Sequence, residues 1–305
     1  MPALEMYNQP LIPNKRTSAT VGQNRSRQHV LVTGAAGTVG QLVTSGLAET
    51  YDLMLTDIRP LPKPSDLPFF QADITDLNAI RPLFQDIDIV LHLAVANWQE
   101  PWEALLQSNI IGAYNVFLAA QEAGCRRVVY TSSVQVVDGA PDELVLSSDA
   151  RVQPSTLYGI TKAWGESLGS FFAHKYGYSV ICLRLGWVVR RDSHDLWPGN
   201  PSLCRAITDE DLISLIGTAM DAPTDLNFVI LNGLSDNRQK RLDISDTRRL
   251  LGYTPQDDVF RLAESNQRSF IRRVVRRLRR GRRLASQMMK KLSFVNAPSP
   301  GENRV

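Results

Sequence analysis

From residue 28 onward, short apolar runs alternate with segments of helical spacing. Apolar runs of about four to eight residues predict buried strands, here at 29–34, 51–57, 69–75, 87–95, 126–133, 179–186 and 228–233. Between them, apolar residues recur every three or four positions, predicting helices at 38–50, 77–85, 102–123, 158–176, 209–220 and 244–252. Strands that alternate with helices pair in parallel and are covered on both faces. The pattern predicts an α/β fold, a Rossmann-like doubly wound parallel sheet with a small C-terminal substrate-binding portion.

Composition divides the chain into three regions. Residues 1–27 are polar, carry three prolines and show no period, which predicts a flexible leader. Residues 28–265 hold the alternating elements, and the long segment 187–207 after the sixth strand is the predicted substrate loop. Residues 266–305 form a basic, amphipathic tail. We therefore expect one enzyme-sized domain between a leader and a tail.

The overall composition excludes several classes of protein. Of 305 residues, 43% are hydrophobic and 21% charged, which is ordinary for a globular protein and excludes a wholly disordered or fibrous one. No run approaches the roughly 20 apolar residues of a membrane-spanning helix, and the start does not read as a secretory signal. Three cysteines cannot form a disulfide framework and match no zinc motif. We expect a cytoplasmic protein that holds no metal.

Charge is distributed unevenly along the chain. The net charge is +3, but residues 268–305 contain twelve Lys or Arg and one acid, Glu302, so the rest of the chain carries −8. Apolar pairs recur about every four residues among the arginines of 268–292. This predicts a basic amphipathic helix that lies on an anionic membrane surface or docks on a partner. A helix that packs its apolar stripe on the body is an equal alternative, and nucleic acid is unlikely because no aromatic residues are interleaved.

A glycine-rich turn follows the first predicted strand. Residues 33–40 read TGAAGTVG and open directly into a helix, a context in which glycines let the backbone approach a pyrophosphate. Asp57 ends the second strand, where a carboxylate accepts hydrogen bonds from the ribose and repels a 2′-phosphate. Arg59 softens that preference. The pattern predicts NAD bound by Gly34, Ala36, Gly37, Thr38, Val39, Gly40, Asp57 and Arg59.

Two residues near the end of the predicted third strand, Asp73 and Ile74, lie where an adenine is expected. Asp73 has a second possible role, because an aspartate at this point also caps a following helix. His92 lies within an apolar strand, which predicts a structural rather than a chemical role.

Tyr158 and Lys162 lie one helical turn apart on the predicted helix 158–176. A nearby ammonium favours the phenolate and lowers the tyrosine pKa, so that Tyr158 can exchange a proton with a substrate hydroxyl. Ser133 ends the fifth strand at the same sheet edge and can hold the substrate oxygen, with Ser132 as its competitor. This order of motifs predicts a dehydrogenase-type site.

Taken together, these segments resemble the extended short-chain dehydrogenase/reductases, the NAD-dependent epimerase/dehydratase family. The resemblance covers residues 28 to about 261 and is carried by TGAAGTVG, Asp57, ADITD, HLAVA, NIIGAYNV, VVYTSS, YGITKAWGE, LRLG and RRLLGYTP. It implies that Ser133, Tyr158 and Lys162 form the catalytic set. It also implies a homodimer formed through the helices before Ala123 and after Tyr158.

The resemblance extends to further cofactor contacts, Leu93, Ala94 and Val95 after the fourth strand. Asn109 matches the asparagine of the family's long helix, although such a residue can also bond to its own helix backbone. The compact layout after the sixth strand is similar to uronate dehydrogenases, which oxidise a hexuronate at C1 to a lactone with NAD. That similarity implies NAD-dependent oxidation of a sugar or sugar acid.

Two departures from that branch concern the substrate. Val134 follows the catalytic serine where the branch has asparagine, and Trp187 follows the strand-six glycine where it has serine. The position of the branch's carboxylate-binding arginine holds no arginine, so Arg190, Arg191 and Arg205 are substitutes, because a guanidinium binds a carboxylate bidentately. Surface charge is an equal interpretation of these arginines, while Trp187, Trp197, Trp98 and Trp102 stack on a sugar or close the pocket.

Three functional hypotheses follow. The first is NAD-dependent oxidation of a sugar or sugar-acid hydroxyl with Tyr158 as the base. The second is epimerisation or dehydration of a sugar or nucleotide sugar, which recycles a tightly bound NAD. The third is a non-catalytic NAD-binding scaffold that acts through its basic tail, and the intact Ser133, Tyr158 and Lys162 argue against it.

Overall fold

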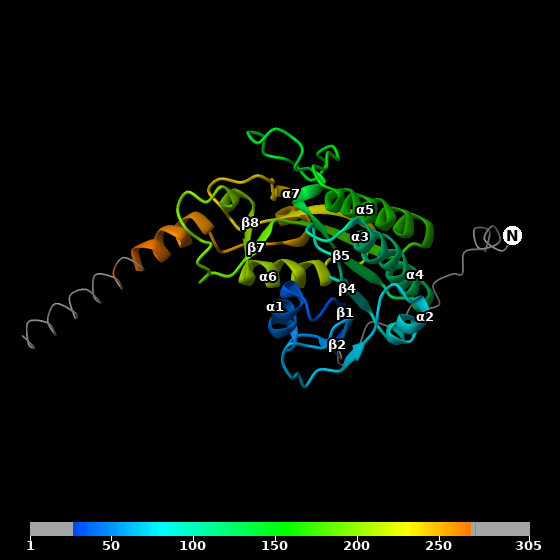
Figure 1. Ribbon diagram of the computed structural model, residues 1–305. Coiled ribbons are helices and arrows are strands. Elements are labelled where there is room, and N and C mark those ends of the chain that lie inside the picture. Colours follow the sequence, from blue (N-terminus) through cyan, green and yellow to red (C-terminus); the bar gives the residue numbers. More distant parts are fainter. Residues whose placement is uncertain (1–26, 270–271, 273–305) are drawn as a thin grey trace, which may run out of the picture.

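The computed structural model describes residues 27–269 and residue 272 (Figure 1). It is built around a seven-stranded parallel sheet with strand order β3-β2-β1-β4-β5-β6-β9. These strands are β1 (His29–Thr33), β2 (Asp52–Asp57), β3 (Phe69–Gln71), β4 (Ile89–His92), β5 (Arg127–Ser133), β6 (Ser179–Leu185) and β9 (Phe228–Gly233). The order reverses between β1 and β4, which is where doubly wound sheets bind their ligands. The predicted fold class is confirmed.

Helices cover both faces of the sheet, because successive residues of a buried strand point to opposite sides. Val30 and Val32 of β1 join the apolar layer under α1 and α6, whereas Leu31 joins the layer under α2, α4 and α5. Figure 1 shows α1 and α6 on one side and α5, α4 and α2 on the other. The bounds are α1 (Thr38–Leu47), α2 (Leu77–Ile80), α3 (Trp102–Leu105), α4 (Ala113–Ala123), α5 (Leu157–Tyr176), α6 (Asp209–Met220) and α7 (Ser245–Leu251).

Three predicted elements differ from the structure in detail. The third strand ends at Gln71, before Asp73 and Ile74, which were expected near its end. The helix predicted over 77–85 ends at Ile80 and continues as a 3-10 turn, Arg81–Phe84, because Pro82 cannot donate an i to i−4 hydrogen bond. The long helix 102–123 contains a π-helical segment, Leu106–Gly112, between α3 and α4.

The predicted substrate loop has secondary structure of its own. Strand β7 (Trp187–Val189) pairs in parallel with β8 (Ala206–Thr208), and a 3-10 turn, Pro201–Arg205, precedes β8. A further helix over 259–269 packs on this small sheet and crosses the predicted boundary at 265/266. The shared apolar cluster contains Val189, Leu196, Leu203, Ala206, Val259 and Ala263.

Most of the predicted leader, residues 1–26, lies outside the described residues, as do residues 270, 271 and 273–305 of the predicted tail. Within residues 27–269 and 272, no helix combines the length and the hydrophobicity needed to cross a membrane. The same residues hold no cluster of His, Cys, Asp and Glu side chains arranged to bind a metal ion.

Candidate active site

The glycine-rich loop between β1 and α1 is held in a shape that only small residues allow. Gly34 has a φ of +74°, and a Cβ there would lie 2.5 Å from the backbone nitrogen of Ala94 after β4. A Cβ on Gly40 would lie 2.3 Å from the Gly34 carbonyl oxygen. Gly37 begins α1 as its N-cap with no capping side chain, so the first amides of the helix keep their donors for a ligand. Such a cradle fits a pyrophosphate.

Asp57 ends β2 and also organises this loop. Its Oδ2 accepts a hydrogen bond from the Ala36 amide at 2.9 Å, and its Oδ1 accepts one from the Arg59 amide at 2.9 Å. The Arg59 guanidinium is 66% exposed, with its Nε 3.5 Å from Oδ1. Because a carboxylate oxygen accepts more than one hydrogen bond, ribose hydroxyls can still bond to Asp57. The carboxylate therefore shapes the loop in addition to its expected contact with the cofactor.

The structure distinguishes between the two roles predicted for Asp73, contact with the adenine and capping of the following helix. Helix α2 is capped by Asp76, whose Oδ1 accepts from the amides of Asn78 and Ala79, so the capping alternative for Asp73 is wrong. Asp73 instead accepts from the Thr75 amide at 2.9 Å in a tight turn beyond β3. Ile74 is buried, which assigns its side chain to the core under α2, α4 and α5.

Asn109 lies in the π-helical segment and does not bond to its own helix. Its Oδ1 accepts from the Ala96 amide at 2.8 Å, and its Nδ2 donates to the Ala96 carbonyl at 3.0 Å. The same Nδ2 donates to Thr161 Oγ1 on α5. Asn109 thus ties the loop after β4, which contains the predicted contacts Leu93, Ala94 and Val95, to the helix that carries Tyr158 and Lys162.

Lys162 is the most tightly held of the three predicted catalytic residues. It is buried, and its Nζ donates to the Thr131 carbonyl of β5 at 2.7 Å. The same nitrogen lies 4.8 Å from the centroid of the Tyr130 ring and 5.7 Å from that of Tyr158. Tyr158 and Lys162 therefore meet at the carboxyl end of β5, as the spacing on the helix predicts.

Burial dominates the protonation of this pair. It raises the pKa of Tyr158 to about 12. It lowers the pKa of Lys162 to about 7, although the Glu166 carboxylate on the next turn favours the ammonium. The prediction that Lys162 brings the Tyr158 pKa below its usual value is therefore wrong for the protein by itself, because loss of solvent around the phenol outweighs the nearby charge.

The two serines at the end of β5 point to different environments. Ser132 Oγ donates to Glu166 Oε1 at 2.6 Å, and Glu166 in turn receives both Nε and Nη2 of Arg184 on β6. Ser133 Oγ instead accepts a 3.2 Å hydrogen bond from the Gln135 amide. Ser132 is thus engaged in a buried ion pair, which supports Ser133 for the substrate oxygen.

Local contacts fix the start of α5 beside Ser133. Thr156 caps the helix by accepting from the Gly159 amide, and its hydroxyl donates to Gln135 Oε1 at 2.6 Å. A Cβ on Gly159 would lie 2.3 Å from the Gln135 carbonyl oxygen. The glycine after Tyr158 therefore allows α5 to approach the segment that follows Ser133.

His92 has the structural role that the apolar strand predicts. Its Nδ1 lies 2.8 Å from Thr33 Oγ1 at the end of β1, and its backbone oxygen accepts from Thr131 Oγ1. Burial lowers the pKa of this imidazole to about 3, so the ring stays neutral at pH 7. It joins the ends of β1, β4 and β5 below the site.

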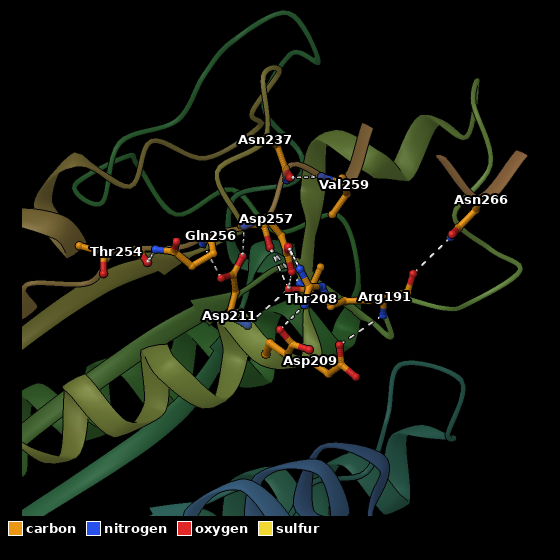
Figure 2. Close-up of polar contacts among 12 residues, drawn as sticks. Arg191, Thr208, Asp209, Asp211, Asn237, Thr254, Gln256, Asp257, Val259 and Asn266 are labelled. Carbon is orange, nitrogen blue, oxygen red and sulfur yellow. Dashed lines mark hydrogen bonds and ion pairs between the residues drawn. The ribbon is translucent and has the colours of Figure 1, made fainter. Parts of the chain in front are cut away.

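Arg191, two residues beyond the end of β7, is held by a network of polar contacts (Figure 2). Its guanidinium pairs with Glu210 and, at 2.6 Å, with the buried carboxylate of Asp257. Its carbonyl oxygen accepts from Asn266 Nδ2 at 3.2 Å. These contacts give Arg191 a structural role, because they join the substrate loop to α6 and to the helix over 259–269.

The other two predicted substrate arginines occupy different surroundings. Arg190 is 64% exposed, pairs with Asp192 at 3.3 Å, and lines a groove of about 700 Å³ beside Thr38 of α1. Arg205 pairs with Asp138 at 2.7 Å and with Asp142 at 2.9 Å. Its backbone lies against the turn after β6, since a Cβ on Gly186 would lie 1.9 Å from the Arg205 oxygen.

The tryptophans divide in the same way. Trp187 is partly buried and packs on the apolar cluster beneath the helix over 259–269. Trp98, Trp102 and Trp197 remain 61%, 43% and 52% exposed. Trp187 therefore contributes to the packing of the small sheet, whereas the rings of Trp98, Trp102 and Trp197 are available to a ligand.

Several functional contacts were not anticipated from the sequence. Glu166 lies four residues after Lys162 on the same helical face, a spacing that signals contact with its neighbour. The Thr131 carbonyl, Thr161 and Gln135 gave no such signal, because a backbone acceptor and partners distant in sequence are not visible in a local pattern.

Comparison with known proteins agrees with this geometry. Residues 30–194 match the model of the NAD dependent epimerase/dehydratase family. The chain belongs to this family. It is an NAD-dependent enzyme of the short-chain dehydrogenase/reductase type, as the glycine loop and the Tyr158 and Lys162 pair indicate.

Three similar proteins are sugar or sugar-acid dehydrogenases. An NAD-dependent glucose-6-phosphate dehydrogenase of Haloferax volcanii is 32% identical over 76% of this chain and 94% of its own length. A uronate dehydrogenase of Pseudomonas putida is 30% identical over 78% of this chain and 88% of its own. The structure of a uronate dehydrogenase mutant from Agrobacterium tumefaciens, complexed with NAD, superimposes with a TM-score of 0.71 at 30% identity and covers 81% of this chain and 90% of that one.

Proposed function

We propose that the protein oxidises a sugar or sugar-acid hydroxyl at C1, with NAD as the hydride acceptor. The observation that carries the proposal is the meeting of Tyr158 and Lys162 with Ser133 at one sheet edge, beside the glycine-rich loop. The similarity to sugar and uronate dehydrogenases supports the substrate class. When bound, NAD supplies the acceptor for a hydride from the sugar carbon.

Each catalytic side chain has a defined part in this proposal. Ser133 Oγ donates to the substrate oxygen and holds it toward Tyr158. The Tyr158 phenolate takes the proton of the sugar hydroxyl as C1 loses its hydride, so a cyclic sugar becomes a lactone and one proton leaves to solvent. The Lys162 ammonium, fixed on Thr131, stabilises the phenolate against the cost of burial.

Arg205 is the proposed substrate residue among the three arginines. It lies against the turn after β6, and β6 pairs Leu185 with Ser133. Asp138 and Asp142 each engage one end of the guanidinium, which leaves further N–H donors, because a guanidinium has five. Arg205→Gln should raise KM for a hexuronate at least about tenfold, in keeping with loss of a charge-assisted hydrogen bond, and raise KM for a neutral aldose less.

The deciding experiment follows NADH absorbance with NAD and a panel of aldoses, aldose phosphates and hexuronates. Tyr158→Phe should lower kcat/KM by about 10²- to 10⁴-fold, as expected for loss of a general base, while NAD binding is retained. If the wild-type protein forms no NADH with any of them yet carries tightly bound NAD, epimerisation or dehydration replaces oxidation. If a function of the protein survives Tyr158→Phe, the scaffold hypothesis replaces both.

We also propose a homodimer formed through α4 and α5. Large apolar side chains remain more than a third exposed on these helices and on the π-helical segment before them, namely Ile111, Tyr114, Ile160 and Phe171. Burial of such a patch stabilises association. Light scattering should give twice the chain mass, and Phe171→Arg should give the monomer; a monomeric wild type would overturn this proposal.

A cytoplasmic location, with peripheral attachment to an anionic membrane through residues 268–292, is proposed as well. The support is the printed sequence, in which apolar pairs recur among basic residues. Apart from Arg268, Ser269 and Arg272, that segment lies outside the described residues.

A further inference from the structure

The helix over 259–269 is firmly attached to the body of the protein. Val259 and Ala263 are buried against the small sheet of β7 and β8. The Val259 amide donates to Asn237 Oδ1 at 3.1 Å, and Asn266 donates to the Arg191 carbonyl (Figure 2). Asp257, two residues before the start of this helix, pairs with Arg191. This helix therefore has an orientation set by the enzyme, and it leads directly into the basic tail.

The outer side of the same helix is basic. Arg261 and Arg268 of this helix are exposed, as is Arg272 beyond it, and the three line a groove of about 490 Å³ together with Arg238 from the loop before α7. Arg238 is fixed in place, because its guanidinium stacks 5.1 Å from the Phe260 ring centroid and pairs with Glu264 at 2.6 Å. We call Arg238, Arg261, Arg268 and Arg272 the basic face.

The charge of the basic face exceeds that of its neighbouring acids. Glu264 engages Arg238, and Asp258 lies 3.5 Å from Arg261. The other two acids beside Arg238 and Arg261 have basic partners of their own, since Asp236 pairs with Lys240 and Arg248 and Asp257 pairs with Arg191. The printed sequence continues from this point with ten Lys or Arg and one acid in residues 273–305. An anionic partner of large area fits this charge better than a small anion does.

The residues between the charges favour a lipid surface over a nucleic acid. Residues 268–292 interleave Ile, Val, Leu and Met with arginine and lysine and contain a single aromatic residue, Phe270. Single-stranded nucleic acids are bound on stacking aromatic side chains. Interfacial segments instead combine aliphatic residues that enter the headgroup region with basic residues that meet lipid phosphates.

We propose that the basic face is a docking surface for anionic lipid headgroups. The proposal rests on the membrane association proposed for the tail and adds the part of the folded body that meets the lipid. Since the helix over 259–269 is packed on the substrate loop, docking through this face sets the orientation of the enzyme and brings the substrate side of the protein near the membrane.

Co-sedimentation of the full-length protein with vesicles tests the proposal. The probes are phosphatidylcholine vesicles and phosphatidylcholine vesicles with about 30 mol% phosphatidylglycerol, at about 0.1 M and about 0.5 M NaCl. The wild type should bind the anionic vesicles and release them at high salt. Arg261→Glu/Arg268→Glu should weaken binding at least about tenfold, because each basic residue near an anionic surface contributes several-fold.

A matched variant controls for the change in net charge. Arg27→Glu/Arg151→Glu carries the same charge change at exposed positions outside the basic face, before β1 and in the loop before α5, and it should bind as the wild type does. Both variants should keep the wild-type far-UV circular dichroism and affinity for NADH, since none of the four arginines lies in the proposed catalytic or cofactor site.

Each of the other possible results would overturn a specific part of the proposal. If Arg261→Glu/Arg268→Glu binds anionic vesicles as tightly as the wild type, the basic face is not the docking surface, although the tail still associates with membranes. If the wild type binds no anionic vesicle, both proposals fall. If a nucleic acid duplex at equal phosphate concentration displaces the protein from the vesicles, nucleic acid is the partner and the lipid assignment is wrong.

Discussion

The proposed cofactor side and the proposed substrate side of this enzyme are stabilised by different means. In the proposed cofactor site, the backbone itself forms the cradle, through the turn at Gly34, the uncapped start of α1 and the closely paired ends of β1 and β4. On the substrate side, ion pairs and side-chain hydrogen bonds hold short segments together, as Arg191 and Asp257 show (Figure 2). A site formed by the backbone can be predicted from a local sequence motif. A site formed by side chains that are distant in the sequence cannot.

The largest expected effect on stability lies between the two sides, at the buried pair of Glu166 and Arg184. Glu166→Gln leaves the Arg184 guanidinium, which is 2% exposed, without its counter-charge. The free energy of unfolding should fall by about 3–5 kcal/mol, as for other broken buried pairs. Urea denaturation measures it, and Glu166→Gln/Arg184→Gln should recover much of the loss; a double variant as unstable as the single one would contradict this account.

The next effect depends on pH, because burial lowers the pKa of Lys162 to about 7. The unfolded chain then binds more protons than the folded one between about pH 7 and the ordinary lysine pKa near 10.5, so this group makes stability rise with pH in that window. Lys162→Met should remove a rise of a few kcal/mol between about pH 7 and 10. Parallel stability curves for the two proteins from denaturation at several pH values would show that Lys162 is not responsible.

A smaller effect is expected at the glycine-rich loop. Gly34→Ala places a Cβ in a left-handed conformation and 2.5 Å from the Ala94 nitrogen. It should cost at least about 2 kcal/mol of stability and weaken NAD binding, because strain and overpacking add. The matched control is Gly177→Ala, at a φ of +73° with no atom within 4 Å, which should cost about 1–2 kcal/mol and leave NAD affinity unchanged. Equal NAD affinity in both variants would contradict the proposed cradle.

The smallest effect is expected on the substrate side. Arg191→Gln removes a guanidinium that is 40% exposed from Asp257, which still accepts a hydrogen bond from Thr208. The free energy of unfolding should fall by only about 1 kcal/mol, since partly exposed ion pairs contribute little. KM for the sugar should rise while NAD affinity stays the same, because the substrate loop loses the ion pairs of the Arg191 guanidinium with Glu210 of α6 and with Asp257. Steady-state kinetics measures both quantities. A change in NAD affinity without a change in KM for the sugar would contradict the assignment of Arg191 to the substrate side.

The parallel sheet, the cofactor motif and the helical spacing of Tyr158 and Lys162 could all be predicted from the sequence. Each of these depends on residues close together in the chain, where hydrophobic period, glycine placement and helical geometry act directly. The tertiary structure decided what depends on distant partners: that Ser132 is held by Glu166, that Asn109 clamps the loop after β4, and that Arg191 serves the C-terminal helix rather than standing free. It also decided that burial raises the pKa of Tyr158, since desolvation is a property of the packed site and not of any local sequence.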